Sequence, residues 1–204
     1  MRTERGLDRL VTFLDAVVAI AITLLVLPLV EVLGEVGGED LGDVLRDDLG
    51  QFGAFALSFV VIARLWLAHH RLTESVGAYD GLFAWVNLAW AFTIVLLPFS
   101  TQVIATFGTD RLSVGLYVGT VLASSATTTV LTVLVRRRAQ LRRPQVAAGE
   151  VDVAASAVVT GLLLAALVLG VALPAVNFFA LLLLFLSGPA ERLVRRGRAG
   201  AEES

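Results

Sequence analysis

The sequence of 204 residues has no cysteine, no lysine and only two histidines. The absence of cysteine excludes disulfide bonds, thiol catalysis and cysteine metal sites. His69 and His70 are adjacent, so on a helix they point about 100° apart and cannot easily bind one metal ion together. The sequence also has no nucleophile elbow, phosphate loop or dinucleotide fingerprint. We therefore expect no enzyme, no cofactor and no resident metal.

Charge is also absent from long stretches of the chain. Hydrophobic residues make up 57% of the sequence, and its mean hydropathy is +0.82, which is too apolar for an ordinary soluble domain. The pattern predicts an all-α integral membrane protein with six transmembrane helices in a single domain, residues 1–204, that ends in a flexible cytoplasmic tail, 196–204. The predicted helices span about residues 10–30, 52–70, 82–105, 113–135, 153–173 and 175–188.

The charged residues lie mainly between these segments, and their sign alternates along the chain. The N-terminus, the 71–81 loop, the 136–152 loop and the tail carry three, one, five and four arginines, whereas the alternate loops carry only Arg46 and Arg111. Cytoplasmic loops are enriched in basic residues, so both termini are predicted to be cytoplasmic. The use of arginine without lysine, with abundant Ala, Val, Leu and Gly, hints at a GC-rich bacterial genome. Together with the apolar segments, this predicts a multi-pass protein of a bacterial cell membrane.

The first apolar segment separates into two unlike faces. Its single charge between Leu10 and Val30 is Asp15. At about 100° per residue, Asp15 lies about 220° from Ile20, and one stripe of about 33 Å lies within roughly 40° of Ile20. The stripe consists of Arg9, Phe13, Ile20, Leu24, Leu27 and Glu31. A carboxylate at this depth needs protein or water around it, so the stripe and the acid should face different environments.

Arg64 lies at a depth in the second segment similar to that of Asp15 in the first. An ion pair between the two would offset the cost of burying each charge. Alternatively, Arg64 extends by itself to the headgroups at the membrane surface. Both arrangements remain open on the sequence alone.

Other polar residues cluster near the same end of the second and third segments. One of His69 and His70 is expected to bond to Asp15 or Asn87, and the other to lie at the membrane surface, while Trp66 fits a packing or interfacial position. The candidate structural polar network comprises Arg9, Phe13, Asp15, Arg64, Trp66, His69, His70 and Asn87. The hydroxyl run 124–129 either joins helices or lines a wet crevice, and helix contact is the preferred interpretation.

The first-helix signature of the transmembrane-protein-175 potassium channel family is similar to the pattern Arg9-x-x-x-Phe13-x-Asp15 followed by AVVAIAITLLVLPL. The family has serine where this chain has Leu14. Bacterial members also resemble the segments SFVVIARLWLAHHRL and WVNLAWAFTIVLLPFST. The resemblance implies a homotetramer of six-helix subunits whose first helices surround a central pore.

By position, Ile20 matches the family's constriction isoleucine, and Leu24 and Leu27 match further aliphatic layers. The family lacks a carbonyl filter of the TVGYG kind, and none occurs here. The expected function is passive conduction of potassium, modestly selective over sodium, with a hydrophobic gate and with Glu31 at the outer mouth. The expected partners are potassium ions, membrane lipid and other copies of the chain, without nucleic acid.

Several other functions remain open. A proton-permeable channel would need titratable groups along its path, whereas the core of the stripe is aliphatic. A cation transporter coupled to protons would favour inverted repeats and broken helices, and neither is evident in the sequence. A scaffold would show no ion flux, and a membrane enzyme would need a catalytic constellation that the motifs do not provide.

Overall fold

The computed structural model describes residues 4–34, 40–108 and 110–172, and this part of the chain is all-α. The elements in chain order are α1 (Glu4–Leu24), α2 (Leu27–Gly34), α3 (Leu41–Asp47), α4 (Leu49–Glu74), α5 (Gly81–Phe107), α6 (Arg111–Arg137), the short 3-10 helices η1 (Ala139–Leu141) and η2 (Ala148–Glu150), and α7 (Val153–Ala172). Within these described residues, five spans are long and apolar enough to cross a membrane. The predicted sixth helix, 175–188, and the tail, 196–204, lie outside the described residues.

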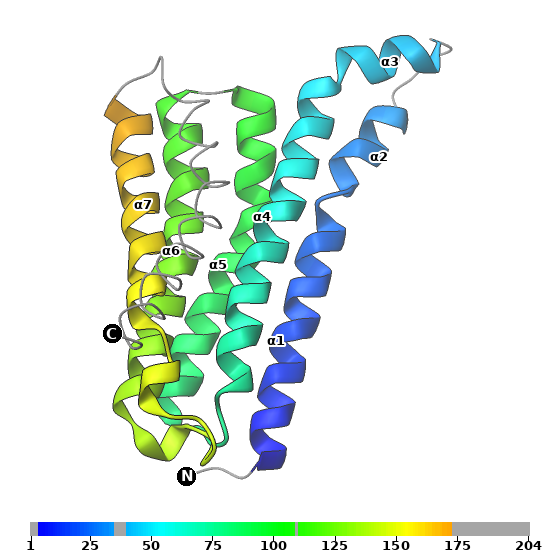
Figure 1. Cartoon of the computed structure of the whole chain (residues 1–204). Helices are drawn as coiled ribbons and strands as arrows, with labels where there is room; N and C mark the ends of the chain where they lie inside the picture. Colours follow the sequence, from blue (N-terminus) through cyan, green and yellow to red (C-terminus); the bar gives the residue numbers. More distant parts are fainter. Residues whose placement is uncertain (1–3, 35–39, 109, 173–204) are drawn as a thin grey trace, which may run out of the picture.

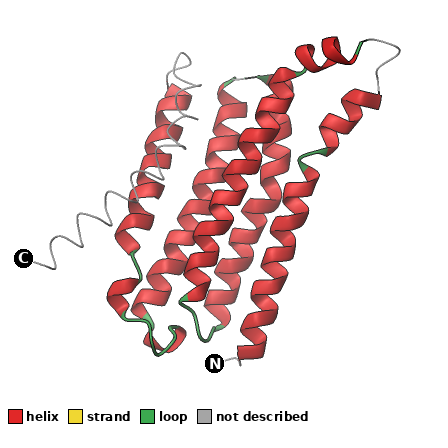
Figure 2. Ribbon diagram, turned by 45° about the vertical axis from the view of Figure 1, so that its right-hand side comes forward, coloured by secondary structure: helices red, strands yellow, loops and turns green. Residues whose placement is uncertain are grey.

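The long helices form an up-and-down bundle (Figure 1). Helix α6 packs between α5 and α7, and α1 packs against α5 and α4. The N-terminal end of α1 and the connections 75–80 and 138–152 lie at one end of the bundle, and the α2–α3–α4 corner lies at the other (Figures 1 and 2). We call the first of these the arginine-rich end, because it carries the five arginines of 136–143.

The connections 75–80 and 138–152 at the arginine-rich end are joined by backbone hydrogen bonds. Gly77 donates its backbone N–H to the Leu141 carbonyl at 2.9 Å, and Arg143 donates its own to the Ser75 carbonyl at 3.0 Å. A Cβ at Gly77 would lie 3.2 Å from the Arg143 Cα, so a side chain there would push the connections apart. Val76 and Leu141 are fully buried beneath this contact. These contacts between the two connections fix α4 and α5 relative to α6.

The first predicted helix differs from the structure in one respect. Instead of one helix over 10–30, α1 ends at Leu24 and α2 begins at Leu27. Pro28 has no N–H to donate to the Leu24 carbonyl, and the Val26 N–H turns to the Thr23 carbonyl at 3.3 Å. Leu27 and Glu31 therefore belong to a separate helical segment from Ile20.

Asp80 begins α5 and also joins it to the end of α6. Its carboxylate accepts the Phe83 N–H at 2.8 Å and forms an ion pair with Arg138. The Phe83 N–H and, after it, the Arg138 guanidinium hold the pKa of Asp80 below its ordinary value of 3.8. Because the pKa is lower in the folded state, this stabilisation is present at neutral pH and is lost as the pH falls through the lowered pKa.

We expect Asp80→Ala to lower the free energy of unfolding at pH 7 by about 1 kcal/mol, the usual value of a lost N-cap. Asp80→Asn retains a capping oxygen and removes the charge, so it should preserve most stability at pH 7 and lose less than the wild type between pH 5 and pH 3. Denaturation in detergent across this pH range measures both effects. Equal acid sensitivity of the wild type and Asp80→Asn would contradict the assignment.

Candidate functional site

One face of α1 is buried in the subunit. Leu14, Val18 and Ala21 of α1, and Leu25 directly after it, are at most 4% exposed. They belong to the main hydrophobic cluster, which includes Trp90 of α5. Their spacing of three or four residues is that of one side of a helix. Leu14, where the chain departs from the first-helix signature, therefore serves as a core residue.

The opposite face of α1 and α2 is uncovered. The side chains of Phe13, Ile20, Leu24 and Leu27 are 51%, 59%, 42% and 51% exposed. Arg9 and Glu31, at the two ends of the predicted stripe, are exposed as well. The whole stripe thus points away from its own subunit, and a membrane, another chain or a conduction pathway must cover it.

Asp15 lies on the inward side of α1 and bonds to α4. Its Oδ1 accepts the Trp66 Nε1–H at 2.8 Å, and the pair is partly buried. The Trp66 ring in turn stacks on His70 with ring centroids 5.2 Å apart. Among the described side chains, Asp15 forms no ion pair with Arg64. Of the two arrangements open for Arg64, the pair with Asp15 is therefore not the one adopted.

His69 is the histidine that bonds to Asn87. His69 Nε2 lies 2.7 Å from Asn87 Oδ1, and Asn87 Nδ2 donates to the Phe83 carbonyl at 2.8 Å. Because the amide nitrogen is committed to that carbonyl, Oδ1 must accept, and His69 Nε2 carries the hydrogen. The imidazole also stacks on Trp90 at 3.8 Å between centroids. This contact joins α4 to α5 in the bundle interior.

The structure divides the eight residues of the predicted network. Asp15, Trp66 and His70 form one group around the α1–α4 contact, and His69 and Asn87 form a second between α4 and α5. His70 Nε2 lies 3.7 Å from Glu74 Oε1. The other three residues lie elsewhere. Arg9 and Phe13 are on the exposed face of α1, and Arg64 lines a pocket between α4, α6 and α7.

Sequence reasoning missed a buried hydroxyl cluster. Thr101 Oγ1 lies 2.8 Å from Ser58 Oγ, and Ser58 Oγ lies 3.1 Å from the Tyr117 hydroxyl. Ser100 and Thr120 form a second contact at 3.2 Å. The available signal was Ser58, a polar residue in the otherwise apolar run FALSFVV. These bonds fix α4, α5 and α6 together behind α1.

The hydroxyl run of α6 both joins helices and lines a cavity. Thr129 Oγ1 lies 2.7 Å from Ser156 Oγ and 2.8 Å from Thr160 Oγ1, and so binds α6 to α7. Ser125 and Thr128 line a pocket of about 240 Å³ between α4, α6 and α7. Ser125 does both, because its hydroxyl also lies 2.8 Å from Thr160 Oγ1 of α7, so the two interpretations of 124–129 hold together.

The arrangement on α1 offers no ligand chemistry. Within the described residues, no group of three or more acidic or histidine side chains could hold a metal ion. Branched aliphatic side chains can only pack, exclude water or leave a gap of defined width. The site is best described as an uncovered aliphatic face on a membrane helix, with Asp15, the one acid between Leu10 and Val30, turned inward.

The fold and this face define the chain as an all-α multi-pass membrane protein with an amphipathic first helix. The family model described as endosomal/lysosomal potassium channel TMEM175 matches residues 9–98. A crystal structure of a lysosomal potassium-selective channel TMEM175 homolog from Chamaesiphon minutus superposes with a TM-score of 0.66 at 25% identity, covering 98% of this chain and 100% of that chain. The chain is therefore similar to TMEM175 channels over residues 9–98 and shares the fold of a solved TMEM175 homolog.

Curated relatives include both bacterial and vertebrate proteins. A potassium channel of Chryseobacterium is 32% identical over 129 residues, or 63% of this chain and 65% of the relative. The mouse endosomal/lysosomal proton channel TMEM175 is 31% identical over 127 residues, or 60% of this chain and 25% of the relative. The chain thus spans less than two thirds of the length of these curated relatives.

Substitutions at Asp15 distinguish a structural acid from one in an ion pathway. Asp15→Leu removes the acceptor of the Trp66 N–H and is expected to lower the free energy of unfolding by about 1 kcal/mol. Asp15→Asn keeps an acceptor oxygen and should cost less. Denaturation in detergent measures the stability, and flux in liposomes measures the ratio of potassium to sodium. A sharp change of that ratio in an intact Asp15→Asn protein would place the carboxylate in the pathway.

Proposed function

We propose that this protein is a cation channel that conducts potassium passively, with modest selectivity over sodium, through a pore lined by α1. The observation that carries the proposal is the division of α1. Ile20 and Leu24 are exposed, while Asp15 is bonded to Trp66 within the subunit. Lipid would also cover an aliphatic face, so the match of Ile20, Leu24 and Leu27 to the pore layers of the similar channel family is what favours a pore over a lipid-facing stripe.

The proposed constriction consists of rings of Ile20, Leu24 and Leu27. Each subunit contributes one side chain to a ring, and the Ile20 and Leu24 rings are about 6 Å apart along the helix. Such rings close a pore by excluding water and conduct when they widen. The break between α1 and α2 places Leu27 on its own short helix, which supports its movement relative to Ile20. Glu31 would concentrate cations at the outer mouth.

The assembly we propose is a homotetramer of subunits with six crossing segments. Only one helix of the described part carries this stripe, so a central pore requires several copies around an axis. The arginine-rich end is proposed to face the cytoplasm, with both termini on that side, in a bacterial cell membrane. The potassium channel named in Chryseobacterium supports this assignment.

Proton conduction is the second candidate, because the vertebrate relatives are named proton channels. A relay through side chains would need titratable groups on the exposed face. Between Arg9 and Glu31 that face is apolar apart from threonine hydroxyls, and Asp15 bonds to Trp66 instead. Protons would therefore have to move along a column of water. This favours potassium as the conducted ion.

The test is flux through the purified protein in liposomes. Potassium, sodium and proton gradients are imposed in parallel, with protein-free liposomes as the control. We expect potassium flux to exceed sodium flux, and crosslinking in a detergent that preserves flux to give four copies. Flux no greater than in protein-free liposomes would leave a scaffold, and proton flux without potassium flux would establish the second candidate.

A further inference from the structure

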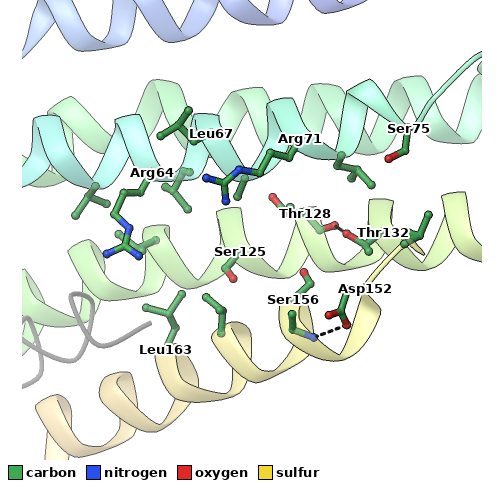
Figure 3. Close-up of a pocket in the computed structure, with 18 of the residues that line it drawn as sticks. Arg64, Leu67, Arg71, Ser75, Ser125, Thr128, Thr132, Asp152, Ser156 and Leu163 are labelled. Carbon is green, nitrogen blue, oxygen red and sulfur yellow. Dashed lines mark hydrogen bonds between the residues drawn. The ribbon is translucent and has the colours of Figure 1, made fainter. Parts of the chain in front are cut away.

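The pocket between α4, α6 and α7 combines two cations with hydroxyl groups. Arg64 and Arg71 of α4 point into it and face the hydroxyl side chains of α6 and α7 (Figure 3). The hydroxyl residues that line the pocket are Ser75, Ser125, Thr128, Thr132 and Ser156. Its remaining walls are mainly aliphatic. Its volume is about 240 Å³.

The two guanidinium groups lie on one side of α4. Arg71 follows Arg64 by seven residues, or two helical turns, so the two Cα atoms are about 10 Å apart along the axis. Neither arginine has an ion pair within 4.0 Å among the described side chains. Arg64 is partly buried in a helix long and apolar enough to span a membrane. A cation at such a position is costly unless it is paired.

The acids at the pocket edge have other partners. Glu150 Oε1 accepts the Ala147 N–H at 2.9 Å, and Asp152 Oδ1 accepts the Ala155 N–H at 3.0 Å. Each carboxylate therefore accepts a backbone N–H at the start of a helix, Glu150 at η2 and Asp152 at α7. The sites between Arg64, Arg71 and the hydroxyl groups remain suited to an anion with several acceptor oxygens.

We propose that this pocket binds an anionic phospholipid, with its phosphate held between Arg64 and Arg71. Planar guanidinium groups bind phosphate through paired hydrogen bonds. The α6 wall is polar, but Thr128 and Thr132 donate their hydroxyl hydrogens to the Ser124 and Thr128 carbonyls, so the two arginines supply the donors. The aliphatic wall, which includes Val121, Val159 and Leu163, suits the first part of an acyl chain. Arg71 belongs to the last turn of α4, at the arginine-rich end, and basic pockets between helices on the cytoplasmic side are known positions for lipid headgroups. The proposal is independent of ion conduction.

The experiment measures lipid binding to the full-length protein after removal of co-purified lipid. Phosphatidylglycerol, phosphatidylcholine and inorganic phosphate are each titrated, and bound molecules are counted by native mass spectrometry with thermal stability in parallel. We expect saturable binding of one phosphatidylglycerol per chain and a rise in thermal stability. Joint substitution Arg64→Gln and Arg71→Gln should weaken this binding about tenfold or more, as expected when charge-assisted hydrogen bonds are lost.

The matched control is Arg137→Gln, an exposed arginine at the same end of the bundle, which should bind phosphatidylglycerol as the wild type does. If the joint substitution does not fold, Ala68→Phe tests the same point, because Ala68 lines the pocket between the two arginines and a ring there fills the headgroup space. Equal binding of phosphatidylcholine, equal binding of inorganic phosphate, or retained affinity in these variants overturns the proposal. So does the absence of saturable binding, which would leave the pocket to another occupant such as segment 175–188.

Discussion

Replacing Ile20 with asparagine is expected to raise potassium flux about tenfold and to weaken discrimination against sodium, while assembly stays intact. The side chain is 59% exposed and packs little against its own subunit, so its loss removes few contacts in the fold. An amide at the proposed constriction would retain water that isoleucine excludes. A barrier lowered by about 1.4 kcal/mol corresponds to a tenfold faster passage.

Two control variants separate a pore from a packing surface. Val168→Asn changes an α7 side chain that is also 59% exposed, and it should leave flux and selectivity unchanged. Val18→Asn places the same amide on the buried face of α1, where the side chain is 3% exposed, and it should reduce folded yield without raising the flux per channel. An Ile20→Asn protein that assembles normally and conducts with unaltered selectivity would remove Ile20 from the constriction.

The two faces of α1 could be predicted from sequence because helical periodicity alone assigns them. Side chains seven residues apart return to nearly the same direction, so Phe13, Ile20 and Leu27 had to share a side, and Asp15 had to face away from them. The structure leaves these three exposed and turns Asp15 to Trp66. The inference needed no knowledge of the other helices.

The partner of Asp15 could not be predicted in the same way. Depth in the membrane matched Asp15 equally well to Arg64 and to Trp66, which are only two residues apart. Two residues correspond to about 200° around α4, so these side chains point to nearly opposite sides. The rotation of α4 about its axis, which its contacts with α1, α5 and α6 determine, turns Trp66 to α1 and Arg64 into the pocket.

The break between α1 and α2 was predictable in principle. Pro28 is visible in the sequence, and proline inside a helix removes one hydrogen bond and clashes with the preceding turn. Its consequence depends on whether the freed carbonyl finds another donor, and the sequence does not decide this. In α5, Pro98 lies within a continuous helix, so the presence of a proline alone does not decide whether a helix breaks.

The contact between His69 and Asn87 should be the most sensitive polar position in the interior. Asn87→Leu removes the acceptor of the His69 Nε2–H and leaves that group buried, since His69 is 2% exposed. We expect the free energy of unfolding to fall by about 1–3 kcal/mol, the cost of a buried polar group without a partner. Thr93→Val is the matched control, because Thr93 is a buried residue of the same helix that bonds only to the Trp90 carbonyl of that helix.

A double-mutant cycle with His69→Phe tests the reason for that loss. Phenylalanine keeps an aromatic ring against Trp90, on which the imidazole stacks at 3.8 Å, and it carries no polar atom that needs a partner. The double variant should therefore be less destabilised than the sum of the two single variants, by about 1 kcal/mol. Denaturation of all four proteins in the same mixed micelles gives the coupling energy. Additive effects would mean that Asn87 stabilises the bundle through the Phe83 carbonyl alone, and that the hydrogen bond to His69 contributes nothing.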